Sequence, residues 1–158
     1  MWDLKINVDA TILIDSAMIA VIAINESGLI VKAWVKQVNT VDPLVAEATA
    51  ILWAVQIAKV ENWDAVCFES DSKLVVECLQ SLVSFWSIVG ICENVKYLAA
   101  DFRHCSFCWV KREINIVGHT LAKLGPKFNL PAVFFPKNLP PFVEEAWFRD
   151  FICIPSVV

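Results

Sequence analysis

Apolar and polar positions near the N-terminus follow the two patterns that are typical of β-strands. From Lys5 to Ile12, polar and apolar residues alternate, which is the period of a half-buried strand. Residues Ala17 to Ile24 form a continuous apolar run. After the turn signal Asn25-Glu26-Ser27-Gly28, the segment Leu29 to Val35 is again apolar. The pattern therefore predicts three antiparallel strands in a meander.

A change to helical spacing follows the third strand. The pair Asp42-Pro43 favours a helix start, because aspartate caps helix N-termini and proline is favoured at the first helical position. Apolar residues then recur along one helix face until Asn62-Trp63-Asp64 ends the helix. These apolar residues are Leu44, Ala48, Ile51, Leu52, Val55 and Ala58.

Strands and helices alternate along the rest of the first 125 residues. The order of elements predicts an α/β domain with a mixed sheet. The predicted elements are a strand over Ala65–Ser70, a helix from Asp71-Ser72 to Leu79, a helix over Ile88–Ala100, a strand over His104–Val110 and a helix over Asn115–Leu124.

The composition changes at Pro126, where prolines and aromatic residues become frequent. We therefore divide the chain into a domain over residues 1–125 and a tail over residues 126–158 that packs on the domain. A tail that binds a partner is the alternative. Its aromatic residues include Phe134, Phe135, Phe142, Trp147, Phe148 and Phe151.

The apolar composition excludes a disordered chain and raises the question of a membrane span. Hydrophobic residues make up 58% and charged residues 19% of the sequence. A span needs roughly 18 consecutive apolar residues, but Ile12–Ile24 contains Asp15 and Leu44–Ala58 contains Glu47. We predict no transmembrane helix. No signal peptide is recognisable either, which leaves cytoplasm or nucleus as the expected location.

Six cysteines occur without a secretory signal, so reduced thiols are expected. Only Cys105 and Cys108 form a CxxC pair, and no second pair completes a zinc ligand set. The segment around them has the pattern of a strand, and we do not predict a zinc site there.

Three carboxylates occupy positions where a carboxylate is costly to bury. Asp9 lies in the middle of the first strand, Glu47 borders the apolar face of the first helix, and Asp71 follows a buried strand. A buried carboxylate needs a partner or a metal. Three such oxygen donors at one point would suit Mg²⁺. Each also has a plain alternative: an exposed strand face for Asp9, a solvated helix residue for Glu47, and an N-cap for Asp71.

Four stretches match a known family in order and spacing, and together they are specific. The chain resembles the type 1 ribonuclease H domain, in the plant branch found in LINE-type retrotransposons and genes derived from them. The resemblance covers roughly Lys5 to Leu124 and, more loosely, the tail. The stretches are Lys5-Ile-Asn-Val-Asp9-Ala10, Ala46-Glu47-Ala48, Glu69-Ser70-Asp71-Ser72 and Val110-Lys-Arg-Glu-Ile-Asn115-Ile-Val-Gly-His119-Thr-Leu-Ala-Lys123.

This resemblance implies a ribonuclease H-like fold, a five-stranded mixed sheet of three antiparallel strands plus two parallel additions, flanked by helices. It implies endonucleolytic cleavage of the RNA strand of RNA–DNA hybrids with two Mg²⁺ or Mn²⁺ ions. By position, Asp9, Glu47 and Asp71 match the first three acidic ligands. A net charge of −4 argues against a nucleic-acid partner, but two bound divalent ions would offset it.

The fourth ligand position holds His119, where the family has an aspartate, as is frequent in the plant branch. Imidazole brings no negative charge and suits Mg²⁺ poorly, so weaker metal binding is expected. A partly buried helix histidine is the alternative. A second departure is the run of Met18, Ala20 and Ile22, where the family usually has glycines. Larger side chains there would either tighten the sheet or crowd the hybrid.

Three further residues of the last matching stretch are expected at the nucleic acid. Lys111 and Arg112 precede the last helix and would contact phosphates, which fixes position without reading sequence. A solvated basic turn is the alternative for this pair. Asn115 belongs to the same stretch and is assigned to the same binding site.

The leading hypothesis is therefore a metal-dependent ribonuclease that acts on RNA–DNA hybrids as a monomer, with no membrane partner. The alternative is a catalytically inert or decayed retrotransposon-derived domain that binds nucleic acid or protein. His119, the replaced glycines and the pI of about 5.1 favour this alternative. Exonucleases of the fold usually have Asp-x-Glu on the first strand, and integrases have a glutamate on the late helix. This chain has neither, and Glu47 favours ribonuclease H.

Overall fold

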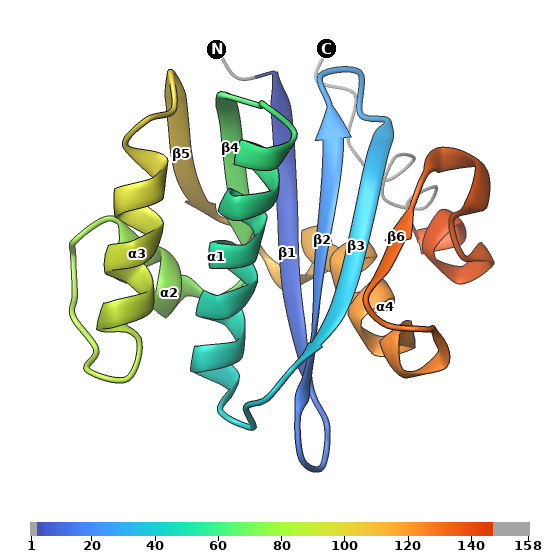
Figure 1. Ribbon diagram of the computed structural model, residues 1–158, viewed down its shortest axis with the longest axis horizontal. Coiled ribbons are helices and arrows are strands. Elements are labelled where there is room, and N and C mark those ends of the chain that lie inside the picture. The colour runs from blue at the N-terminus through green and yellow to red at the C-terminus, as the bar shows by residue number, and fades with distance from the viewer. Residues whose placement is uncertain (1–2, 147–158) are drawn as a thin grey trace.

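The computed structural model describes residues 3–146 and contains one mixed sheet with helices on both faces (Figure 1). The strand order is β5-β4-β1-β2-β3-β6. The first three strands form the predicted antiparallel meander, and β4 and β5 extend it in parallel from β1. The bounds are β1 (Leu4–Ile12), β2 (Ala17–Asn25), β3 (Ile30–Val38), β4 (Ala65–Ser70) and β5 (His104–Trp109).

A sixth strand, β6 (Ala132–Phe134), pairs antiparallel with β3 and corrects the expected count of five. Three residues are too few to show a strand period in the sequence, which is why this strand was not predicted. Beyond it, Val143 and Ala146 are buried against the domain. The tail residues Trp147, Phe148 and Phe151 lie outside the described residues.

The predicted helices all form, with ends that differ by a few residues. Asp42 caps α1 (Pro43–Val60), where its Oδ1 accepts bonds from the backbone N–H groups of Leu44 at 2.9 Å and Val45 at 3.3 Å. By length and composition alone α1 could cross a membrane, but here it is a core helix packed on the sheet. The helices α2 (Lys73–Leu79) and α3 (Val89–Ala99) lie on the same side of the sheet as α1 (Figure 1).

The last helix is built from two parts. A 3-10 turn, η1 (Arg112–Asn115), comes first, and α4 (Ile116–Leu124) follows it on the opposite face of the sheet from α1. Short 3-10 turns at η2 (Gly125–Lys127) and η3 (Pro136–Asn138) then lead along the tail. The predicted helix over Asn115–Leu124 is thus present, with Asn115 as the end of the turn.

The continuous apolar run of β2 is explained by burial on both faces. Ile19 and Val21 face the core beneath α1, whereas Met18, Ala20 and Ile22 face the core beneath α4. All five side chains are fully buried. The side chains that replace the family's glycines therefore fill the core under α4 rather than stand on a surface open to a substrate.

The CxxC pair lies on β5 and does not form a ligand pair. Cys105 packs toward the core beneath α1. Cys108 is three positions later, so its side chain points to the opposite face of the strand. Its Sγ lies 3.4 Å from that of Cys67.

Candidate metal centre

The three predicted carboxylates meet at one end of the sheet. One ligand oxygen from each of Asp9, Glu47 and Asp71 lies within 4.8 Å of the other two. Within residues 3–146, this is the one group of three histidine, cysteine or acidic side chains close enough to share a metal ion. The set that the sequence singled out is therefore a cluster in space.

Strand register explains how Asp9 and Asp71 meet. β1 and β4 are parallel, and Asn7 pairs with Glu69 at the end of their ladder. Asp9 comes two residues after Asn7, and Asp71 comes two residues after Glu69. Side chains two positions apart share a face, so both carboxylates lie at the same level beside one another.

Glu47 comes from the first turns of α1. The alanines on either side of it, Ala46 and Ala48, are almost completely buried. Their small side chains let the helix backbone approach β1 closely, which brings the glutamate over Asp9.

Burial of three neighbouring carboxylates makes this cluster a candidate site for a cation. Burial, with the charges of Asp9 and Asp71, raises the pKa of Glu47 well above its usual value. Burial and the charge of Asp71 raise the pKa of Asp9, which the neighbouring His119 partly lowers. Burial also raises the pKa of Asp71, against the lowering effects of Arg112 and His119. A divalent ion would stabilise all three anions together.

One unsatisfied oxygen supports the same assignment. Oε2 of Glu47 is enclosed and has no hydrogen-bond partner. A buried acceptor without a partner costs free energy unless an ion or another donor fills the gap. The donor set of three carboxylate oxygens suits a hard cation such as Mg²⁺ or Mn²⁺.

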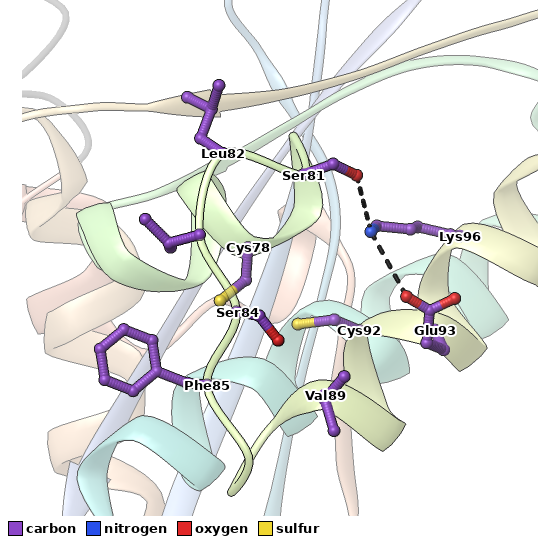
Figure 2. A pocket seen from close by; sticks show the side chains of 10 residues that line it. Cys78, Ser81, Leu82, Ser84, Phe85, Val89, Cys92, Glu93 and Lys96 are labelled. Carbon is purple, nitrogen blue, oxygen red and sulfur yellow. Dashed lines mark hydrogen bonds and ion pairs between the residues drawn. The ribbon is translucent and has the colours of Figure 1, made fainter.

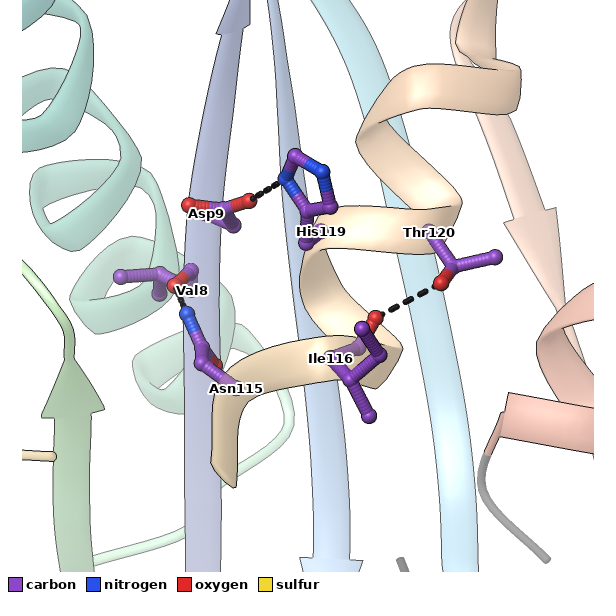
Figure 3. Close-up of polar contacts among 6 residues, drawn as sticks. All are labelled: Val8, Asp9, Asn115, Ile116, His119 and Thr120. Carbon is purple, nitrogen blue, oxygen red and sulfur yellow. Dashed lines mark hydrogen bonds and ion pairs between the residues drawn. The ribbon is translucent and has the colours of Figure 1, made fainter. Parts of the chain in front are cut away.

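Of the three carboxylates, His119 bonds to that of Asp9. Its Nδ1 lies 3.0 Å from Oδ2 of Asp9. Figure 3 shows the two side chains pointing toward one another. The ring comes from α4, across the sheet from α1. The preceding residue, Gly118, also packs close to β1, since a Cβ there would be in van der Waals contact with that of Asp9 at 3.4 Å. The structure therefore places His119 beside the first strand carboxylate.

The three residues expected at the nucleic acid separate into two kinds. Lys111 and Arg112 are exposed, and Arg112 is close enough to lower the pKa of Asp71. Asn115 is fully buried, and its Nδ2 donates to the Val8 carbonyl at 2.7 Å (Figure 3). A side chain enclosed in this way cannot contact a nucleic acid directly, so we correct its role to anchoring the start of α4.

The sequence interpretation missed Trp109. Its indole Nε1–H donates to the backbone carbonyl of Asp71 at 3.2 Å, while 47% of the residue is exposed. An aromatic residue two positions before the basic pair was the available signal, but it was assigned only to a strand.

A pocket of about 440 Å³ lies elsewhere, between α2, α3 and the loop that joins them (Figure 2). Lys96 and Ser81 both line it, and Nζ of Lys96 donates to Oγ of Ser81 at 2.9 Å. None of the candidate site residues lines it. The carboxylate cluster is therefore separate from this pocket.

The sequence model of the reverse transcriptase-like family matches residues 7–125, and the chain belongs to this family. No curated protein matches the chain significantly. The expected ribonuclease H-like domain is confirmed. Its assignment to a plant or retrotransposon branch stays a prediction.

Solved structures confirm the fold class. RNase H1 from the archaeon Halobacterium salinarum is 19% identical, with a TM-score of 0.73 over 78% of this chain and 97% of that one. The N-terminal RNase H domain of Rv2228c from Mycobacterium tuberculosis is 19% identical, with a TM-score of 0.72 over 80% and 95%. LC11-RNase H1 in complex with an RNA/DNA hybrid is 18% identical, with a TM-score of 0.69 over 76% and 94%.

Proposed function

We propose that this protein hydrolyses the RNA strand of RNA–DNA hybrids in a reaction that depends on Mg²⁺ or Mn²⁺, with two ions in the site. The observation that carries the proposal is the cluster of Asp9, Glu47 and Asp71 within 4.8 Å. Membership of the reverse transcriptase-like family supports it. One fold neighbour is in complex with an RNA/DNA hybrid, which supports this partner.

The residues have distinct roles in this proposal. Asp9, Glu47 and Asp71 hold the ions, and His119 orients Asp9 or takes the fourth ligand position. Bound divalent ions supply charge neutralisation and Lewis-acid activation for attack on a phosphodiester. Lys111 and Arg112 contact phosphates at the exposed edge. Recognition would rest on backbone shape and ribose 2′-hydroxyls rather than base sequence.

Cleavage of a labelled RNA–DNA hybrid in Mg²⁺ and in Mn²⁺ tests the proposal. Glu47→Gln and Asp71→Asn should each abolish cleavage, because each removes a ligand charge. Glu26→Gln is the matched control, since Glu26 is exposed in the turn after β2, at the far end of β1 from Asp9. Cleavage that survives Asp71→Asn would contradict the site assignment.

The alternative is a nucleic-acid binding module without activity. The contact of His119 with Asp9 favours it, because the imidazole already bonds to Oδ2 of Asp9, an oxygen that a metal ion would otherwise bind. Saturable binding of the hybrid by folded protein, with no cleavage in either metal, would establish this alternative. A monomer in cytoplasm or nucleus stays the expectation in both cases.

A further inference from the structure

An exposed aromatic ring lies beside the carboxylate cluster but is not part of it. Trp109 is the last residue of β5, and it pairs with Ser70, the residue before Asp71. About half of the residue is exposed. An exposed aromatic face next to a catalytic cluster offers contact area to whatever that cluster binds.

The ring is fixed in place by polar contacts. The indole N–H donates to the Asp71 carbonyl, and the next backbone N–H, that of Val110, donates to the Ser70 carbonyl at 2.9 Å. Gln80 ties the same strand to the end of α2 through a 2.9 Å bond to the carbonyl of Phe107. A ring held in this way loses little conformational freedom when it contacts a ligand.

Positive charge borders the ring. Nζ of Lys73, at the start of α2, lies 6.0 Å from the ring centroid. The exposed Lys111 and Arg112 follow Trp109 two and three positions further along the chain. An aromatic face among cations suits a sugar-phosphate backbone, because the ring packs on a base or sugar while the cations attract phosphates.

We propose that Trp109 and Lys73 form a nucleotide-contact site at the β5 edge of the carboxylate cluster. The indole face packs against a nucleotide of the bound strand, and the Lys73 ammonium contacts a backbone phosphate. This inference rests on the proposed function, because it names the part of the substrate that lies next to the cleavage site.

A second role for Trp109 must be separated from this one. Its N–H bond to Asp71 would give it an effect on cleavage through positioning alone. Trp109→Phe separates the roles, since phenylalanine keeps an aromatic face and loses the N–H donor. Trp109→Ala removes both.

The test measures binding of a fluorescent hybrid by anisotropy in Ca²⁺, across a range of salt concentrations, beside cleavage in Mg²⁺ and Mn²⁺. We expect Trp109→Ala to weaken binding roughly five- to tenfold with an unchanged salt slope. Trp109→Phe should bind within about twofold of the wild type. Lys73→Gln should lower the slope of log affinity against log salt by about one.

Matched controls lie away from the end of β5 that carries Trp109. Tyr97→Ala removes another exposed aromatic ring, near the end of α3 that leads to the start of β5. Lys137→Gln removes an exposed cation in η3, beside β3 at the other edge of the sheet. Both should bind like the wild type.

The outcomes distinguish the two proposals. Wild-type affinity in Trp109→Ala, or equal weakening in the Phe and Ala variants, overturns the contact site and leaves hybrid cleavage standing. Wild-type protein that neither binds nor cleaves the hybrid overturns both. If thermal melting shows that Trp109→Ala does not fold, Lys73→Gln decides, and an unchanged salt slope overturns the contact site.

Discussion

Nδ1 of His119 on α4 lies 3.0 Å from Oδ2 of Asp9 on β1, which joins two residues 110 positions apart in the chain. The contact stabilises the Asp9 carboxylate without adding negative charge, since it lowers the pKa of Asp9 that burial raises. The cluster therefore presents three carboxylates to a metal rather than four. A weaker attraction for a divalent ion follows from this charge.

The first prediction concerns this missing charge. His119→Asp should lower the Mg²⁺ concentration for half-maximal cleavage by about tenfold, the scale of changes around a metal's ligands. Titration of the cleavage rate with Mg²⁺ measures the effect. His104→Asp is the control, because His104 is exposed at the start of β5, away from the cluster. An unchanged Mg²⁺ requirement in His119→Asp would show that position 119 has no part in metal binding.

The second prediction sets stability against activity. Glu47→Gln removes one of three like charges and should stabilise the metal-free protein while it abolishes cleavage. We expect melting in EDTA at pH 8 to rise by roughly 2–4 °C, which about 1 kcal/mol produces in a chain of this size. Glu26→Gln should melt like the wild type. A lower melting temperature for Glu47→Gln would mean that the glutamate stabilises the fold without metal.

The third prediction is a pH dependence. Burial raises the pKa values of Asp9, Glu47 and Asp71 above the usual 3.8 for aspartate and 4.5 for glutamate, and repulsion by neighbouring carboxylates adds to this for Asp9 and Glu47. The metal-free folded state therefore holds more protons than the unfolded state in the pH range between the usual and the raised values. Its stability should fall as pH rises through that range.

Metal and protons compete for the same oxygens, so the Mg²⁺ requirement should increase as pH falls toward that range. Cleavage rates against Mg²⁺ concentration at several pH values between 8 and 6 check this, with melting in EDTA over a wider range. If the half-maximal Mg²⁺ concentration does not change with pH in protein that stays folded, the ions do not bind to these three carboxylates.

Much of the site was predictable because it depends on the spacing of apolar residues within each element and on the pairing of parallel strands. The alternation in Lys5–Ile12 and the Asp42-Pro43 start place Asp9 and Glu47 on their elements. Parallel pairing of β1 with β4 then brings Asp71 beside Asp9. The family resemblance added the order of these pieces.

The parts that sequence did not predict depend on which way single side chains face. Asn115 and Trp109 lie six residues apart at the same end of the sheet, and no period distinguishes the buried one from the exposed one. The sequence likewise did not show whether Met18, Ala20 and Ile22 are buried or face a substrate, because this depends on the position of α4 over β2. Contacts between distant segments decide all of these.

The last prediction follows from the position of Asn115. β1 pairs with β4 only from Leu4 to Asn7, and the carbonyl of Val8, just past that ladder, accepts its 2.7 Å bond from the Asn115 amide. This bond joins the start of α4 to the strand that carries Asp9. Asn115→Ala leaves a buried carbonyl without this donor, which should cost about 1–3 kcal/mol.

Melting by circular dichroism measures that loss, which corresponds to a decrease of roughly 2–4 °C for each kcal/mol. Asn138→Ala is the control, because Asn138 makes an exposed bond to the backbone N–H of Phe135 in η3. Cleavage by Asn115→Ala below its melting temperature should also decrease, since α4 carries His119. If this variant melts and cleaves like the wild type, Asn115 does not anchor α4, and the position of His119 depends on the packing of the helix alone.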